Sequence, residues 1–258
     1  MAQPSGPSGN AEPKGWRLGV GAGSRFAPSY VGDDAYRMSL LPSIQVKYGD
    51  RFFASIENGV GYNIVNSDGF RTGPIARIRF GRDENGSQPF AIAGDATTDL
   101  IGLGDVGATA ELGGFFEYKI NSLKVGLEAR KGANGHKGAV IDASLRYGGR
   151  SFVFGPPLIY SFGPRVTVVD NNYHSTYFDV DASQSIASGL PIFDANGGIH
   201  SYGFGATFIL PITRDDKLSA VIAAGYDRLA GDAAISPLVQ QRGSRDQIST
   251  GLFFSYWF

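Results

Sequence analysis

The last eleven residues of the chain, 248–258, constrain the fold more than any other segment. Ile248, Leu252, Phe254, Tyr256 and Phe258 share one parity, and small or mixed side chains lie between them. Successive side chains of a strand point to opposite faces, so this segment has one continuous apolar face. An uncapped apolar strand is a liability in a soluble protein, whereas a closed barrel in lipid has no free edge. The segment therefore favours a membrane barrel over the alternative, the last strand of a soluble β-sandwich.

Alternation with period two recurs along almost the whole chain. It predicts eleven strand segments, at residues 16–22, 36–48, 52–62, 76–80, 108–118, 123–129, 141–147, 151–169, 202–210, 218–226 and 248–258. Single-chain bacterial barrels have an even number of strands. We therefore expect an all-β, transmembrane antiparallel β-barrel of twelve strands, and the pattern allows ten to twelve. The twelfth strand is expected from a hairpin at Asn58-Gly59 or from a break at Gly155-Pro156-Pro157.

A periplasmic C-terminus sets the expected topology. Short periplasmic turns are predicted at residues 120–122, 148–150 and 211–217, and long extracellular loops at 82–104, 131–138, 170–197 and 229–245. Six tyrosines near segment ends are typical of interfacial aromatic belts: Tyr36, Tyr48, Tyr62, Tyr118, Tyr147 and Tyr226. Ordinary β-propensity of tyrosine is the alternative explanation for each of them.

Composition narrows the class of protein. The chain of 258 residues has no cysteine, which excludes disulfides and thiolate metal sites, and its net charge of −1 gives no field for nucleic acid. It has no apolar run long enough for a transmembrane helix, which does not exclude a barrel. Residues 1–14 lack the pattern of a signal peptide and are expected to form a flexible tail before a single barrel domain, 15–258. If the protein is exported, the sequence corresponds to a mature form with an added Met1.

No motif points to catalysis, a cofactor or a metal. Gly102-Leu-Gly-Asp-Val-Gly107 matches G-x-G-x-x-G, but the residues that follow alternate like a strand, and a phosphate cradle needs a helix there. His136, His174 and His200 are far apart in sequence and are expected to be solvated loop residues. A barrel hydrolase would need a serine, a histidine and an acid together, and no nucleophile motif accompanies these histidines.

The polar parity of the strands carries balanced charge that we expect to face the lumen. The predicted charge network consists of Arg77, Arg79, Glu111, Glu117, Glu128, Arg130, Asp142 and Arg146. Opposite charges across neighbouring strands attract, so the lumen is expected to be ion-paired and filled or tightly constricted. A narrow polar channel is the alternative.

Two further sets of residues have expected roles outside the lumen. Tyr256 and Phe258 are expected to form the signal that the outer-membrane assembly machinery recognises on the last strand. The loops 170–197 and 229–245 are expected to fold over the barrel mouth, because they are rich in apolar residues, with Asp232 and Ser236 bracing the second loop. These apolar residues are Tyr173, Tyr177, Phe178, Ile186, Leu190 and Phe193.

Several short segments, in order along residues 15–258, resemble one family of outer-membrane proteins. The most specific are Ser185-Ile-Ala-Ser-Gly189, Tyr226-Asp-Arg-Leu-Ala-Gly-Asp-Ala233 and Ser236-Pro237-Leu-Val239. Others are Gly19-Val-Gly-Ala-Gly, Tyr30-Val-Gly32, Gly102-Leu-Gly-Asp105, Gly135-His-Lys-Gly138, Tyr177-Phe178 and the terminal Tyr256-Trp-Phe258. In this order they resemble the MipA/OmpV family, also called MltA-interacting proteins. One departure is Asp179, where the family pattern has glycine, and it leaves the geometry of the loop 170–197 open.

The resemblance implies a bacterial outer-membrane barrel without catalytic residues. It implies a scaffold that links a lytic transglycosylase to a murein synthase at the cell envelope. A small constricted passive channel and a surface adhesin are the alternatives. Outer-membrane lipid and lipopolysaccharide are the other expected partners, and no nucleic acid is expected.

Overall fold

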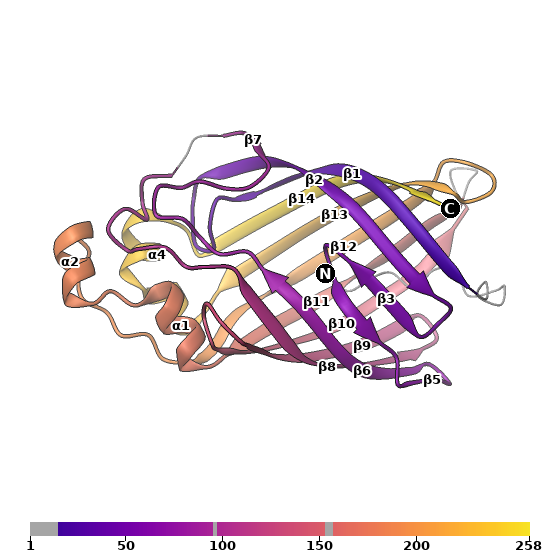
Figure 1. Ribbon diagram of the computed structural model, residues 1–258, viewed down its shortest axis with the longest axis horizontal. Coiled ribbons are helices and arrows are strands. Elements are labelled where there is room, and N and C mark those ends of the chain that lie inside the picture. The colour runs from indigo at the N-terminus through magenta and orange to yellow at the C-terminus, as the bar shows by residue number, and fades with distance from the viewer. Residues whose placement is uncertain (1–14, 95–96, 153–156) are drawn as a thin grey trace.

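The computed structural model describes residues 15–94, 97–152 and 157–258, so the tail expected at 1–14 lies outside the described residues. Within the described ranges the strands form one antiparallel sheet that closes on itself, because β1 pairs with both β2 and β14. The strands are β1 (Trp16–Pro28), β2 (Tyr36–Tyr48), β3 (Phe52–Ser55), β4 (Gly59–Tyr62), β5 (Val65–Ser67), β6 (Phe70–Arg79), β7 (Ala91–Ala93), β8 (Thr109–Ile120), β9 (Leu123–Gly132), β10 (Ala139–Ser151), β11 (Leu158–Val169), β12 (Gly198–Pro211), β13 (Leu218–Leu229) and β14 (Asp246–Trp257). All but β5 and β7 build the wall, so the expected twelve-stranded barrel is confirmed (Figure 1).

The predicted hairpin at Asn58-Gly59 supplies the twelfth strand. β3 and β4 pair with each other around a three-residue loop, 56–58, and Gly59 takes a positive φ of 78°. Both strands are short, so they fill only part of the wall between β2 and β6. Nearer the other end of β2, the short β7 pairs with Met38 and Ser39. The alternative break, at Gly155-Pro156-Pro157, lies mostly outside the described residues.

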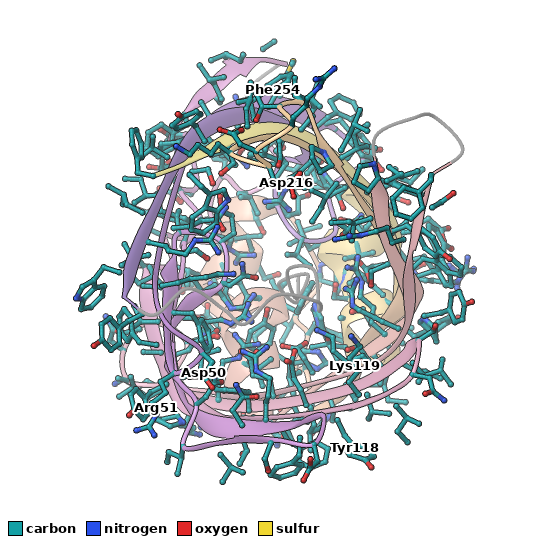
Figure 2. All side chains as sticks on the ribbon, turned by 90° about the vertical axis from the view of Figure 1, so that its right-hand side faces the viewer. Asp50, Arg51, Tyr118, Lys119, Asp216 and Phe254 are labelled. Atoms are coloured by element: carbon teal, nitrogen blue, oxygen red, sulfur yellow. The ribbon has the colours of Figure 1, made fainter. Side chains whose placement is uncertain are left out.

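Side chains alternate across the wall as expected. Ile78 is 71% exposed on the outer surface, whereas its neighbours Arg77 and Arg79 form ion pairs on the inner side. Figure 2 shows the same alternation in β8, where Tyr118 points away from the barrel and Lys119 lies on the inner side. Because lipid replaces water around a barrel, the apolar parity belongs outside.

The predicted turn at 148–150 is wrong. β10 continues through Gly149, which pairs with Tyr160 of β11, and the strand ends at Ser151. A Cβ on Gly149 would lie 2.7 Å from the hydroxyl of Tyr160. Glycine therefore makes room for a tyrosine ring on the neighbouring strand rather than for a reversal of the chain. The turn predicted at 120–122 is present, with Ile120 opposite Leu123.

Helices gather at one end of the barrel. α1 (Asn171–Phe178) and α2 (Ala182–Ser188) follow β11, and α3 (Gly231–Ile235) and α4 (Pro237–Arg242) follow β13. We call these helices, with the segments 29–35, 97–103 and 133–138 beside them, the cap. Seen from the opposite end, helices lie across the far end of the barrel (Figure 2). The chain ends at the end without helices, where the turns are short, which in outer-membrane barrels is the periplasmic end.

Apolar side chains pack beneath the cap, so the expectation that 170–197 and 229–245 fold over the mouth is confirmed. The buried clusters contain Tyr30, Leu100, Leu103, Tyr173, Phe178, Val180, Leu190, Leu229, Ala233, Leu238 and Val239, with Tyr177 and Phe193 partly buried against them. Ile186 is an exception, because it is 88% exposed on α2. No helix of the described residues is long and apolar enough to span a membrane.

Candidate functional site

Glu111 is the centre of a buried network on one side of the lumen. Its carboxylate accepts hydrogen bonds from Arg79 Nε at 2.5 Å and His136 Nε2 at 2.9 Å, and a third from Arg130. The whole residue is buried. An isolated buried carboxylate is costly, and three donors compensate for its lost hydration.

The ion pairs extend from Glu111 along β6, β8, β9 and β10. Six of the eight predicted network residues are joined in this way, and a seventh, Glu117, forms ion pairs of its own beside them. We call this group the paired side of the lumen. Its further contacts are Arg130 with Glu128 at 2.8 Å and with Asp142, Arg77 with Glu128 at 2.6 Å, and Glu117 with Arg71 at 3.4 Å and Lys124 at 3.0 Å. The charges of this side largely neutralise one another.

Arg146, the eighth predicted residue, forms none of these ion pairs, although Glu117 lies within electrostatic range of it. It is 6% exposed, and its Nε is buried without a hydrogen-bond partner. A Cβ on Gly205 would lie 3.2 Å from Arg165 Nη1 and 3.7 Å from Arg146 Nη2, so two guanidinium groups flank this glycine. Arg25 of β1 also lies within electrostatic range of Arg165. We call Arg25, Arg146 and Arg165 the arginine side of the lumen.

The arginine side retains positive charge. Asp227 accepts two hydrogen bonds from Arg165, one of them from Nε at 2.7 Å. Among the described residues, Arg25 and Arg146 have no acidic side chain within ion-pair distance. The balanced charge that we expected for the lumen is therefore not found on this side. The alternation of β1 extends to Arg25, three residues beyond the segment predicted for that strand, so the sequence does contain a signal for this residue.

Both sides border one cavity of about 700 Å³ that extends from the cap into the barrel. Among its lining residues are eight arginines, namely Arg25, Arg37, Arg71, Arg77, Arg79, Arg82, Arg146 and Arg165, and five acidic residues, namely Asp83, Glu117, Glu128, Asp142 and Asp227. The excess of fixed positive charge favours small anions over cations in this space.

The three histidines are buried, so the expectation of solvated loop histidines is wrong. His136 accepts from the Gly138 N–H through Nδ1, which leaves Nε2 to donate to Glu111. His174 bonds the Asn196 carbonyl at 2.5 Å and His200 at 3.2 Å. Separation along the chain conceals this arrangement, because α1 and the loop 133–138 converge only over the closed barrel.

The histidines have structural partners. In the described residues, no histidine ring forms a hydrogen bond with a serine or threonine hydroxyl, as a nucleophile would require. The rings instead pack in a row, with Tyr173 5.0 Å from His136 and 5.4 Å from His200 between ring centroids. The row connects the paired side to the cap.

The predicted loop residues lie in the cap. Tyr173 and Phe178 are buried on α1, and the Arg79 guanidinium lies over the ring of Tyr173 at 5.3 Å. Burial, together with the neighbouring Tyr173, raises the pKa of Tyr177 to about 12. Its hydroxyl therefore stays protonated at neutral pH.

The polar residues of the second loop brace the cap. The side chain of Asp232 accepts from the Asn196 backbone at 2.8 Å, which joins the two long loops. Ser236 caps α4, and Pro237 is the first residue of that helix. Asp179, the departure from the family pattern, ends α1 and accepts from the Ala195 N–H at 2.6 Å. The Asp179 carboxylate, which a glycine would lack, thus joins two parts of the loop 170–197.

The glycine-rich segment holds a carboxylate of the protein itself. Gly102 and Gly104 have positive φ, and both N–H groups donate to Glu84 Oε2 at 3.2 Å. Successive N–H groups of this kind make an anion-binding concavity, and Glu84 occupies it. β8 follows the segment, as the alternation predicts, so no helix N-terminus faces a phosphate.

The predicted assembly residues lie at the periplasmic end of β14. Tyr256 pairs with Val20 of β1, and the Phe258 N–H donates to the Leu18 carbonyl at 2.9 Å. The rings of Tyr256 and Phe258 are 4.9 Å apart between centroids, and Phe258 is 68% exposed. The last strand therefore closes the barrel while its final ring remains outside.

Comparison with solved structures finds outer-membrane proteins. The NanC porin is similar with a TM-score of 0.42 and 12% identity, over 93% of this chain and 98% of that chain. A FadL homologue of Pseudomonas aeruginosa is similar with a TM-score of 0.36 and 9% identity, over 94% and 89%. No curated protein matches the chain. Residues 20–258 match the family described as MltA-interacting protein MipA, which is nearly the whole chain.

Proposed function

This chain belongs to the MltA-interacting protein family, and from that membership we propose that it is a non-enzymatic outer-membrane barrel that docks a murein-cleaving lytic transglycosylase of the MltA kind. The family match over residues 20–258 is the observation that carries the proposal. The barrel supplies the anchor in the membrane, and the docked enzyme supplies the chemistry. A murein synthase docked beside it would complete the scaffold that the family resemblance implies.

The geometry supports the periplasmic end as the docking face. The outer end is covered by the cap, and murein lies on the periplasmic side of the outer membrane. Exposed apolar side chains lie in the short turns at the periplasmic end, among them Ile64 at 71% and Ile212 at 50% exposure. Apolar side chains that a partner can cover contribute most to binding when they lie near the centre of the contact.

A binding assay with purified components tests the proposal. The barrel in detergent should bind a purified MltA-type lytic transglycosylase, and the double variant Ile64→Glu, Ile212→Glu should weaken binding at least tenfold. Ile186→Glu is the matched control, because it places the same charge at an exposed isoleucine of the cap, and it should leave binding unchanged. Absence of binding by the unaltered barrel, or equal loss in the control, would contradict the proposal.

The charge of the cavity favours a second function, a constricted passive path for small anions. The observation that carries it is the excess of eight arginines over five acidic residues in the cavity lining. The unpaired Arg25 and Arg146 would attract a carboxylate or phosphate, and the ion pairs opposite would limit its size.

Planar-bilayer recordings under a salt gradient test this second function. The unaltered barrel should conduct weakly with a preference for anions, and Arg146→Gln should reduce that preference. Arg214→Gln removes the same charge from an exposed periplasmic turn and should leave the preference unchanged. A barrel that does not conduct, or that prefers cations, would exclude the path.

A further inference from the structure

Three carboxylates of the cap converge. One oxygen from each of Asp33, Asp34 and Asp99 lies within 4.8 Å of the other two. Asp33 and Asp34 belong to the segment between β1 and β2, and Asp99 belongs to the segment between β7 and β8. Among the described residues, none of the three forms an ion pair with a lysine or arginine. Like charges this close repel one another, which favours either protonation of one carboxyl group or a compensating positive charge.

Asp33 is held in place by its backbone. It is completely buried, its N–H donates to the Tyr30 carbonyl at 3.1 Å, and its carbonyl accepts from Gln247 Nε2 at 3.0 Å. The residue also forms a bridge with Gly243, which follows α4. These contacts fix the backbone from which the Asp33 carboxylate projects.

One oxygen of the Asp33 carboxylate lacks a partner. Oδ1 accepts from the Ala35 N–H at 3.0 Å, whereas Oδ2 is buried and has no hydrogen-bond partner. Burial, with the carboxylates of Asp99 and Asp34 nearby, raises the pKa of Asp33 to about 6. Buried polar atoms in native proteins are satisfied with few exceptions, and a bound ion is one way to satisfy such an atom.

The guanidinium group of Arg242 bonds to main-chain carbonyls in this region. Arg242 at the end of α4 donates from Nη1 to the backbone carbonyl of Asp99 at 2.7 Å and from Nη2 to the carbonyl of Ser188. These bonds fix the segment that carries Asp99 beneath α4. They satisfy its main-chain carbonyl, and one oxygen of its carboxylate accepts a hydrogen bond from Thr97 Oγ1 at 3.1 Å.

We propose that Asp33, Asp34 and Asp99 bind a calcium ion. The ion would join the segment between β1 and β2 to the segment between β7 and β8. Carboxylate oxygens are the ligands that Ca²⁺ prefers, at 2.3–2.6 Å, so two ligands on opposite sides of the ion lie about 4.6–5.2 Å apart. Each pair of oxygens in this cluster is separated by at most 4.8 Å, so all three can reach one calcium ion. Mg²⁺ usually keeps several waters and is bound through one or two carboxylates, whereas three carboxylates converge here. Asp34 is exposed, so water can complete the coordination on that side.

Terbium luminescence tests binding directly. Tb³⁺ replaces Ca²⁺ at oxygen sites, and Tyr30, next to Asp33, can sensitise its emission. The barrel in detergent free of lipopolysaccharide should show tyrosine-sensitised emission that Ca²⁺ displaces. Asp34→Asn should weaken Tb³⁺ binding at least tenfold, and because Asp34 is exposed, this variant does not disturb the packing. Asp68→Asn is the control, since it removes one carboxylate from a periplasmic turn, and it should bind like the unaltered protein.

Thermal melting supplies a second measurement, in which the difference in melting temperature between Asp33→Asn and the unaltered barrel should change sign when Ca²⁺ is added. In excess chelator, Asp33→Asn should melt at or above the temperature of the unaltered barrel, because it removes repulsion among the carboxylates. In millimolar Ca²⁺ the order should reverse, because only the unaltered barrel gains stability from the ion. A Ca²⁺ response that Asp33→Asn and Asp34→Asn share fully with the unaltered protein would overturn the site. Absence of any response in the unaltered protein would overturn it as well.

Discussion

The wall and the cap of this protein obey opposite rules for where apolar and charged residues lie. In the wall, Ile78 is 71% exposed while Glu111 is completely buried in the lumen. In the cap, Phe178 and Leu238 are each 1% exposed. The wall faces lipid outside and charge inside, whereas the cap faces water outside and needs an apolar interior. Where the strands leave the membrane, the buried side chains therefore change from charged to apolar.

The difference implies that the two regions depend on different interactions. Backbone pairing around the closed sheet holds the wall, and ion pairs fill its interior. Apolar packing and helix caps hold the cap, as in a soluble domain. Substitutions should therefore separate the two regions, and the residues where they meet should have the largest effects.

The largest effect is expected at Glu111, where the wall meets the cap. Glu111→Ala leaves Arg79, Arg130 and His136 facing one another without their shared carboxylate. Removing one member of a buried ionic network costs about 3–5 kcal/mol. Denaturant unfolding of barrel refolded in detergent measures the loss. Glu57→Ala, at an exposed position in the β3–β4 loop, is the control, with an expected change below about 0.5 kcal/mol. A loss in Glu111→Ala no larger than in the control would show that the network contributes nothing.

A large effect confined to the cap is expected at Phe178. This ring packs with Ala195, Leu229 and Val239, and Phe→Ala in a well-packed core costs about 3–5 kcal/mol. Hydrogen exchange should therefore accelerate in α1 and α4 and stay unchanged in β12 and β13. Ile186→Ala, at the exposed isoleucine of α2, should alter exchange in neither region. Acceleration throughout the barrel would contradict the separation of wall and cap.

The wall could be predicted from the sequence because lipid imposes a strict period of two. The alternation within each strand identifies its outer and inner faces without reference to the rest of the chain. The twelfth strand follows from the turn that Asn58-Gly59 favours. The glycine pair at 148–149 misled the prediction, since glycine serves both reversals and close packing, and only the partner strand, with Tyr160, distinguishes the two.

The interior of the cap could not be predicted, because its contacts join segments far apart in the chain. The partnership of His136 with Glu111 depends on how loops converge over the closed barrel. The helices did leave local signals. Asp181 and Gln184 have the spacing of a capping box, and Ser236-Pro237 is a typical helix start, so a search for helix starts would have found α2 and α4.

A moderate effect is expected at the start of α2. The Asp181 carboxylate accepts from the Gln184 N–H at 2.8 Å, and Gln184 donates through Nε2 to the Leu103 carbonyl at 2.7 Å. Loss of such a cap costs about 0.5–2 kcal/mol of local helix stability. Asp181→Ala should therefore increase protease cutting between residues 181 and 190 while the melting temperature of the barrel stays unchanged. Asp181→Asn, which keeps a capping oxygen, should restore most of the resistance. Equal cutting in both variants would assign the effect to lost charge instead of the cap.

The smallest effect on the finished barrel is expected at Phe258, whose role we place in assembly. The ring is 68% exposed, so Phe258→Ala should cost less than about 1 kcal/mol, since full burial of such a side chain is worth about 1.5–3 kcal/mol. Its backbone bond to Leu18 survives the substitution. The amount of barrel inserted in cells should nevertheless fall. Before the barrel closes, β14 is unpaired, and the assembly machinery would recognise its aromatic face by pairing it with a sheet edge. Ile248→Ala, at the other end of the same strand and 51% exposed, removes similar apolar surface and should insert normally. Normal insertion of Phe258→Ala, or failure of that variant to refold in detergent, would show that the last residue of the wall is not an assembly signal.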